Sequence, residues 1–228
     1  MKYFPDNRTQ ASTNIKQVQS VVLRMLKIMD HICSENDIHF WLEYGTMLGA
    51  VRHNGFIPWD NEADIGMMRN DFEQFSAIAA NALPHDIFFQ TKDTDAEYLY
   101  SSNYIEAKLR DKYSNYCNFE VNHPEFRWHN GIQVDIFIYD YDEVHGGCFT
   151  NAYERLFNHS NSYLTEAEVE YQEKCKFEDT HFYIPAGYDP YLRRNYGNYM
   201  LLPPEAERQA EYVEVFKPCR HKETLIWK

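Results

Sequence analysis

Apolar residues recur every three or four positions along residues 14–36, which is the spacing of one face of an α-helix. Val18, Val22 and Met25 belong to this apolar stripe. A second stripe over residues 70–83 predicts another helix, and a proline directly after it ends the pattern. We expect the first helix, which is the longer one, to pack against a sheet.

Short runs of β-branched and aromatic residues predict the strands of that sheet. The clearest run is IQVDIFIY at residues 132–139, and the stretch from Tyr98 to Lys112 alternates in part like a strand. Shorter strands are predicted at residues 40–42, 65–68 and 87–89. Strands and helices that follow one another along the chain predict an α/β or α+β fold. Farther along, helices are expected at about 149–158 and 165–175.

Three acidic residues, Asp60, Glu62 and Asp64, occur at intervals of two. In an extended chain such residues point to one face, where their carboxylates repel one another and lose hydration if they are buried. A divalent cation relieves both effects, and Mg²⁺ prefers oxygen ligands of this kind. The alternative is a solvated acidic edge strand. We favour the cation, because a turn predicted at Gly45 and Thr46, a short helix and an apolar loop precede the acids.

Asp135 lies inside the predicted strand at residues 132–139, between Val134 and Ile136. A lone carboxylate among apolar residues is costly unless it is paired or bound to a metal. One interpretation is an ion pair with a buried lysine or arginine. The other is a third ligand for the same cation.

Lys108, Arg110 and Lys112 alternate along the stretch AKLRDK, so a strand here puts all three on one face. One interpretation is an exposed basic edge. The other is a phosphate clamp, because cations opposite an acidic metal site can hold a diphosphate.

Composition limits the classes of function. With 228 residues, 44% of them hydrophobic, the chain can form one domain with a sizeable core. A net charge of −13 argues against nucleic-acid binding, which needs a basic surface. No apolar run approaches the roughly 20 residues of a membrane span. Five scattered cysteines without a C-x-x-C pair are typical of free thiols in a reducing compartment. We expect a cytoplasmic protein, and peripheral association with a membrane is compatible with these features.

The stretch GTMLGAVRHNGFIPWDNEADIGM resembles the signature of the LicD family of phosphocholine transferases, whose relatives include fukutin and fukutin-related protein. It differs at Glu62, where the family usually has aspartate, and at Asn61 and Ala63. AKLRDK, VDIF and the stretch YIPAGYDPYLRRNYGNYMLLPP also resemble segments of that family. The resemblance runs from the first predicted helix to about Arg208.

This resemblance implies a nucleotidyltransferase-like fold, which is a mixed β-sheet flanked by helices. It also implies a single domain, residues 1–228, with a core at about 14–140 and a helical, lid-like C-terminal part at about 141–228. It implies a metal-dependent phosphotransferase that moves a phospho-alcohol, such as phosphocholine, from a CDP-activated donor to a sugar hydroxyl of a cell-surface glycan or its lipid-linked precursor. CMP would be released. Two alternatives are a nucleotidyltransferase that consumes a nucleoside triphosphate and a non-catalytic nucleotide- or glycan-binding relic of the fold.

Under the leading hypothesis, Glu62, Asp64 and Asp135 hold Mg²⁺ or Mn²⁺ against the donor diphosphate. Asp60 is either a further ligand or a base for the acceptor hydroxyl, and both roles stay open.

Five further residues are expected to bind the donor. Gly45 lets the backbone come close, and Thr46 donates to a phosphate oxygen. Arg52, Lys108 and Arg110 neutralise the remaining phosphate charge.

Overall fold

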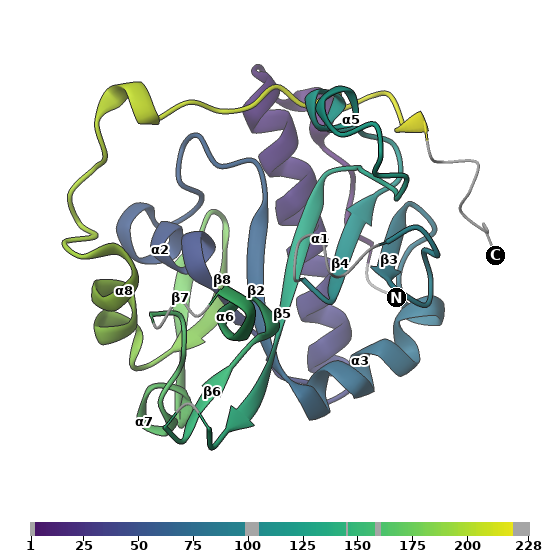
Figure 1. The fold of residues 1–228 in the computed structure, drawn as a ribbon. Helices are drawn as coiled ribbons and strands as arrows, with labels where there is room; N and C mark the ends of the chain where they lie inside the picture. Colours follow the sequence, from purple (N-terminus) through teal and green to yellow (C-terminus); the bar gives the residue numbers. More distant parts are fainter. Residues whose placement is uncertain (1–2, 99–104, 145, 158–160, 221–228) are drawn as a thin grey trace.

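The computed structural model describes residues 3–98, 105–144, 146–157 and 161–220, and Figure 1 shows their arrangement. At its centre is a mixed sheet of six strands in the order β1-β2-β5-β4-β3, with β6 paired to β5. β2 and β5 are parallel, and the other pairs are antiparallel. The strands are β1 (Trp41–Leu42), β2 (Ala63–Met68), β3 (Ile87–Thr91), β4 (Ala107–Asp111), β5 (Gln133–Asp142) and β6 (Cys148–Thr150).

Helices flank this sheet, which confirms the predicted fold class. A separate two-stranded sheet is formed by β7 (Gln172–Phe177) and β8 (Thr180–Pro185). The α-helices are α1 (Asn14–Glu35), α2 (Tyr44–His53), α3 (Arg69–Ala82), α5 (Cys117–Asn122), α6 (Ala152–Phe157), α7 (Glu166–Val169) and α8 (Tyr188–Tyr196), and the 3-10 helices are η1 (Arg8–Gln10) and η2 (Glu205–Glu207).

Helix α1 matches the first predicted helix closely. The Thr13 hydroxyl caps its N-terminus by accepting a hydrogen bond from the Lys16 amide at 3.4 Å. Its apolar stripe, including Val18, Val22 and Met25, is completely buried. Figure 1 shows α1 behind the central strands, so the stripe packs against one face of the sheet.

The structure differs from the predictions around the first strand and the acids. Gly45 and Thr46 do not form a turn, because they lie in the first turn of α2. The Glu43 side chain caps this helix by accepting from the Tyr44 amide, so the helix begins directly after β1. β2 begins only at Ala63, and the two acids before it therefore lie in the preceding loop.

Two further expectations about secondary structure are only partly correct. Of the strand expected from Tyr98 onward, β4 forms Ala107–Asp111, and residues 99–104 lie outside the described part of the chain. The helix expected at 165–175 is the single turn α7, and β7 follows it. Alternate residues Phe182 and Ile184 of β8 are buried, so the C-terminal region is less helical than expected and contains a packed hairpin.

A C-terminal strap, residues 198–220, crosses the molecule from α8 to α5 (Figure 1). Asn14 at the start of α1 exchanges two hydrogen bonds with the Val213 backbone. The buried Arg8 guanidinium joins both Asp111 carboxylate oxygens to the Val215 carbonyl. The two ends of the chain are thus attached to β4 through one arginine.

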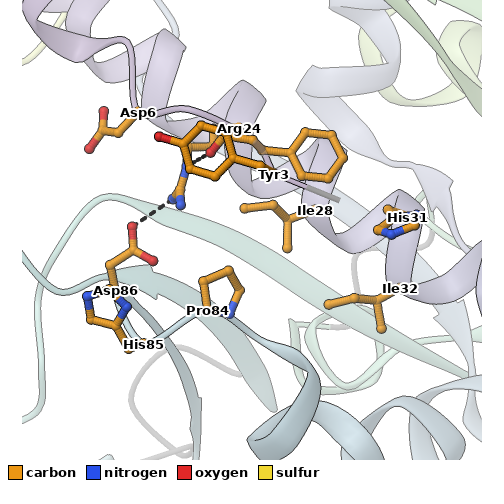
Figure 2. A pocket seen from close by; sticks show the side chains of 10 residues that line it. Tyr3, Asp6, Arg24, Ile28, His31, Ile32, Pro84, His85 and Asp86 are labelled. Carbon is orange, nitrogen blue, oxygen red and sulfur yellow. Dashed lines mark hydrogen bonds and ion pairs between the residues drawn. The ribbon is translucent and has the colours of Figure 1, made fainter. Parts of the chain in front are cut away.

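A cavity of about 390 Å³ lies between α1 and the chain before β3 (Figure 2). Ile28, Ile32 and Pro84 give it an apolar wall. Beside them, Arg24 forms a 2.9 Å ion pair with Asp86, which ties α1 to the start of β3. None of the predicted site residues lines this cavity, so it is distinct from the predicted active site.

Candidate active site

Three adjacent strands bring charged residues into one row of the sheet. β2 and β5 pair with Asp64 opposite Asp135, and β4 pairs with β5 so that Lys108 is also opposite Asp135. Glu62 lies just before β2. Glu62, Asp64 and Asp135 each offer an oxygen, and the three oxygens lie within 4.8 Å of one another. We call these three residues the acidic centre.

Both predicted cations of β4 are buried beside this centre. The Lys108 ammonium nitrogen lies 2.7 Å from Asp135 Oδ1, and the two side chains are 5% and 4% exposed. Arg110 donates to Gln90 Oε1 at 2.9 Å and to the Gly131 carbonyl at 2.8 Å. The exposed basic edge is therefore wrong, because β4 lies between β3 and β5.

Asp135 is thus paired with a buried lysine, as one of its two interpretations predicted. That pairing does not exclude the other interpretation. Among the described residues, the Lys108 ammonium is the only polar partner of the buried Asp135 Oδ1, and a carboxylate oxygen can accept from more than one partner. A carboxylate oxygen with this unused acceptor capacity is suited to a metal ligand, so metal ligation by Asp135 stays a prediction.

Burial and mutual repulsion favour the neutral forms of the acids. Burial, with Asp135 as the next largest cause, raises the pKa of Glu62 to about 7. The pKa of Asp64 is raised well above its usual value by burial and then by Glu62. Burial alone raises the pKa of Asp60 to about 6. For Lys108, burial outweighs the attraction of Asp135 and lowers the pKa. A bound cation would reverse this balance for the carboxyls.

Gly45 and Thr46 approach the acids from the first turn of α2. A side chain at Gly45 would place its Cβ 3.4 Å from Asp60 Oδ2 and 4.0 Å from Asp64 Oδ2, so the glycine leaves open space in front of both carboxylates. The buried Thr46 hydroxyl accepts a hydrogen bond from the Asp64 amide at 2.8 Å. Thr46 therefore fixes the start of β2, a role that the sequence did not reveal.

Asp60 and Arg52 lie at the margin of the site. Asp60 influences the pKa of Glu62 and Asp64, but it is not one of the three acids whose oxygens converge. Arg52, at the end of α2, donates to the Tyr199 carbonyl at 2.7 Å. Arg52 also donates from Nε to His53 Nε2 at 2.9 Å, so its described contacts lie with its neighbour in α2 and with the C-terminal strap.

Comparisons with known proteins place the chain in a family. The family described as LicD/FKTN/FKRP, nucleotidyltransferase domain, matches residues 37–187, which include every predicted site residue. The chain belongs to the LicD family. The lipopolysaccharide cholinephosphotransferase LicD of Haemophilus influenzae is 22% identical over 88% of this chain and 96% of that protein.

Two animal proteins of the LicD family are also similar. Human ribitol 5-phosphate transferase FKRP is 47% identical, but over only 15% of this chain and 7% of that protein. Mouse ribitol-5-phosphate transferase FKTN is 21% identical over 89% of this chain and 37% of that protein. This LicD-family chain thus spans little more than a third of the fukutin that it matches.

The structure adds two residues of this LicD-family site that sequence reasoning missed. Gln133 donates to Glu62 Oε2 and, at 3.1 Å, to Asp135 Oδ2, so it holds two of the acids together. Its position two residues before Asp135 in one strand was the available signal, because such residues share a face.

Glu43 is the second residue, and it is completely buried behind the site. It accepts hydrogen bonds from Trp41 Nε1 and from the Tyr191 hydroxyl. Burial raises its pKa to about 7. Because Tyr191 lies far along the chain in α8, no local pattern in the LicD signature could reveal this contact. The network connects α8 to the start of α2.

Among the described residues, no helix combines the length and the apolar character that crossing a membrane requires.

Proposed function

We propose that this protein is a metal-dependent phosphotransferase that moves a phospho-alcohol from a CDP-activated donor to a sugar hydroxyl of a glycan and releases CMP. The observation that carries the proposal is the convergence of Glu62, Asp64 and Asp135 beside two buried cations. Family membership supports the same class of reaction, because the named relatives are cholinephosphate and ribitol phosphate transferases.

The acidic centre fits Mg²⁺ or Mn²⁺. Its donor set consists of three carboxylates, and hard divalent cations prefer oxygen ligands. Glu62, Asp64 and Asp135 would hold the ion, which supplies charge neutralisation at the diphosphate when it is bound. Gln133 supports this set, because it orients Glu62 and Asp135 through hydrogen bonds.

Lys108 and Arg110 are proposed to bind the phosphates. Both side chains line a cavity that Glu62 also lines, so a diphosphate there could meet the cations and the acidic centre together. The open space in front of Gly45 allows a ligand to approach Asp60 and Asp64 closely. Thr46 acts on the site chiefly through the Asp64 amide.

Asp60 is proposed as the base that accepts the proton of the attacking hydroxyl. It lies next to the acidic centre but outside the set of three converging acids, which favours this role over that of a metal ligand. Arg52 is proposed to act at a distance by holding the C-terminal strap near the site.

The Haemophilus relative is a lipopolysaccharide cholinephosphotransferase, so we propose a glycan acceptor that is lipid-linked. The five cysteines are free thiols, which is typical of a reducing compartment, so we propose that the reaction takes place on the cytoplasmic side of a membrane.

A panel of CDP-alcohols, assayed for CMP release with and without glycan acceptors and with MgCl₂ or EDTA, tests the proposal. We expect acceptor-dependent CMP release that requires the metal and that Asp64→Asn abolishes. Nucleotide attached to the product, with a nucleoside triphosphate as donor, would instead identify a nucleotidyltransferase. Binding of donor without turnover under any condition would indicate a non-catalytic relic.

A further inference from the structure

A second, smaller cavity opens directly beside the acidic centre. Its volume is about 280 Å³, just below the roughly 300–1,000 Å³ of ligand pockets, so it suits one part of a donor molecule. Glu62, Lys108 and Arg110 form its charged wall. The opposite wall is aromatic and comes from the chain around α5, with Tyr116, Phe119, Phe126 and Trp128.

Three rings of the aromatic wall form a cluster, in which Phe126 is nearly parallel to both of its neighbours while Phe119 and Trp128 are tilted by 35° to one another. The Phe126 and Trp128 ring centroids are 4.3 Å apart with planes at 20°, and Phe119 and Phe126 are 5.7 Å apart at 17°. Trp128 is buried, whereas Phe119 and Phe126 are half-buried and keep accessible ring surface. Parallel rings continue naturally onto another flat ring. An aromatic cage for a quaternary ammonium group instead needs ring faces that surround the cation.

Polar groups around the stack can address the edge of a flat ring. The Asn61 carbonyl is held by the Tyr116 hydroxyl at 2.8 Å, which fixes the loop between the two walls. The exposed Glu211 carboxylate also lines the cavity, on the side formed by the C-terminal strap. A carboxylate accepts a hydrogen bond from an exocyclic amine, such as N4 of cytosine, and repels a carbonyl at the same position.

We propose that this cavity binds the nucleobase of the donor, as a flat ring with an exocyclic amine that stacks on Phe126 and directs its amine to Glu211. The inference rests on the proposed function. The base then lies on the aromatic wall, and the diphosphate extends toward Lys108 and the acidic centre. Specificity for the base is thus located on α5 and the strap, apart from the residues that hold the metal and the phosphates.

Calorimetry with CMP, UMP and phosphocholine in buffer with MgCl₂ tests this assignment. Phe126→Leu keeps an apolar side chain of similar volume but removes the stacking ring, and it should weaken CMP binding about 5- to 150-fold while phosphocholine binding is unchanged. Glu211→Gln should reduce the preference for CMP over UMP about fivefold or more. Tyr212→Ala, at an exposed neighbour outside the cavity, is the matched control and should change neither.

Three outcomes would overturn the assignment. If Phe126→Leu has the same melting temperature as the parent and binds CMP with the same affinity, the base lies elsewhere. In that case, turnover of CDP-alcohols would still support the proposed function. If Phe126→Leu weakens phosphocholine but not CMP, the alcohol end occupies this cavity. If the parent binds neither CMP nor CDP-choline, the inference and the proposed function fail together.

Discussion

Replacing Asp135 by asparagine tests how the acidic centre is held when no metal is bound. The Lys108 nitrogen and Asp135 Oδ1 are 2.7 Å apart, and at an effective dielectric constant of about 20 two unit charges at this distance attract by about 6 kcal/mol. Desolvation offsets part of this attraction, and removing one partner of a buried pair usually costs roughly 3–5 kcal/mol. Glu62 also stabilises the Lys108 charge, so we expect a loss near the lower end, about 3 kcal/mol.

Asp64→Asn should behave differently. Burial and neighbouring carboxylates already hold the pKa of Asp64 well above its usual value, so its charged form contributes little to the metal-free fold. Removing that carboxyl should leave the free energy of unfolding unchanged or slightly raised. Both variants should lose transferase activity, because both carboxylates are proposed metal ligands.

The assay is urea unfolding in EDTA at pH 7, followed by circular dichroism. The double variant Lys108→Met with Asp135→Asn should regain most of the lost stability, because it leaves no unpaired buried charge. The loss caused by Asp135→Asn alone should shrink as pH rises toward 9. Burial lowers the pKa of Lys108 in the folded protein, and the loss of Asp135 lowers it further. Between this folded-state pKa and the higher pKa of Lys108 in the unfolded chain, the unfolded chain binds more protons, so the free energy of unfolding of the variant rises with pH. An Asp135→Asn variant that unfolds at the same urea concentration as the parent would refute the ion pair.

Three further predictions follow from the same geometry. In EDTA, the melting temperature of the parent should fall as pH rises from about 5 to 8. Folded Glu62 and Asp60, with pKa values of about 7 and about 6, hold protons that the unfolded chain releases at lower pH. Excess MgCl₂ should reduce this dependence of the melting temperature on pH, and a melting temperature in EDTA that does not change with pH would contradict the burial of these two acids. Arg110→Ala should lower the free energy of unfolding in urea by roughly 1–3 kcal/mol, because it removes the contacts with Gln90 and Gly131. It should also weaken donor binding in calorimetry, whereas the control Lys112→Ala should leave donor binding unchanged. An Arg110→Ala variant as stable as the parent would mean that these contacts are absent. Gly45→Ala should leave the melting temperature unchanged, because the new Cβ makes an ordinary contact at 3.4 Å. It should reduce CMP release, because the methyl group fills the space in front of the Asp60 and Asp64 carboxylates. Full activity of this variant would show that no ligand enters that space.

Local patterns predicted much of the fold. The apolar stripe of α1 and the β-branched run of β5 are periodic over many residues, and both elements occur where those patterns lie. The hairpin of β7 and β8 was missed because Glu- and Tyr-rich composition suggested a helix, although Phe182 and Ile184 alternate with polar neighbours. In that region, the spacing of the apolar residues predicts the secondary structure better than the amino-acid composition does.

The site was predictable to a smaller extent. Asp64 was singled out by the two-residue spacing of three acids, and Asp135 because a lone carboxylate in an apolar strand needs a partner. The contact of Asp135 with Lys108 depends on the register between β5 and β4, which no local pattern specifies. Glu43 depends on Tyr191 in α8, almost 150 positions later, and such a contact exists only in the folded chain.

Because both ends of the chain are attached to β4, the unit that folds is longer than the segment that matches the family. The family match covers residues 37–187, yet Arg8, α1 and Val215 all lie outside it. A fragment cut at the match boundaries would uncover the sheet face that α1 buries and would leave Asp111, which is 1% exposed here, without its guanidinium partner. Such a fragment would expose a large apolar surface, and we expect it to aggregate even though it retains every residue of the acidic centre.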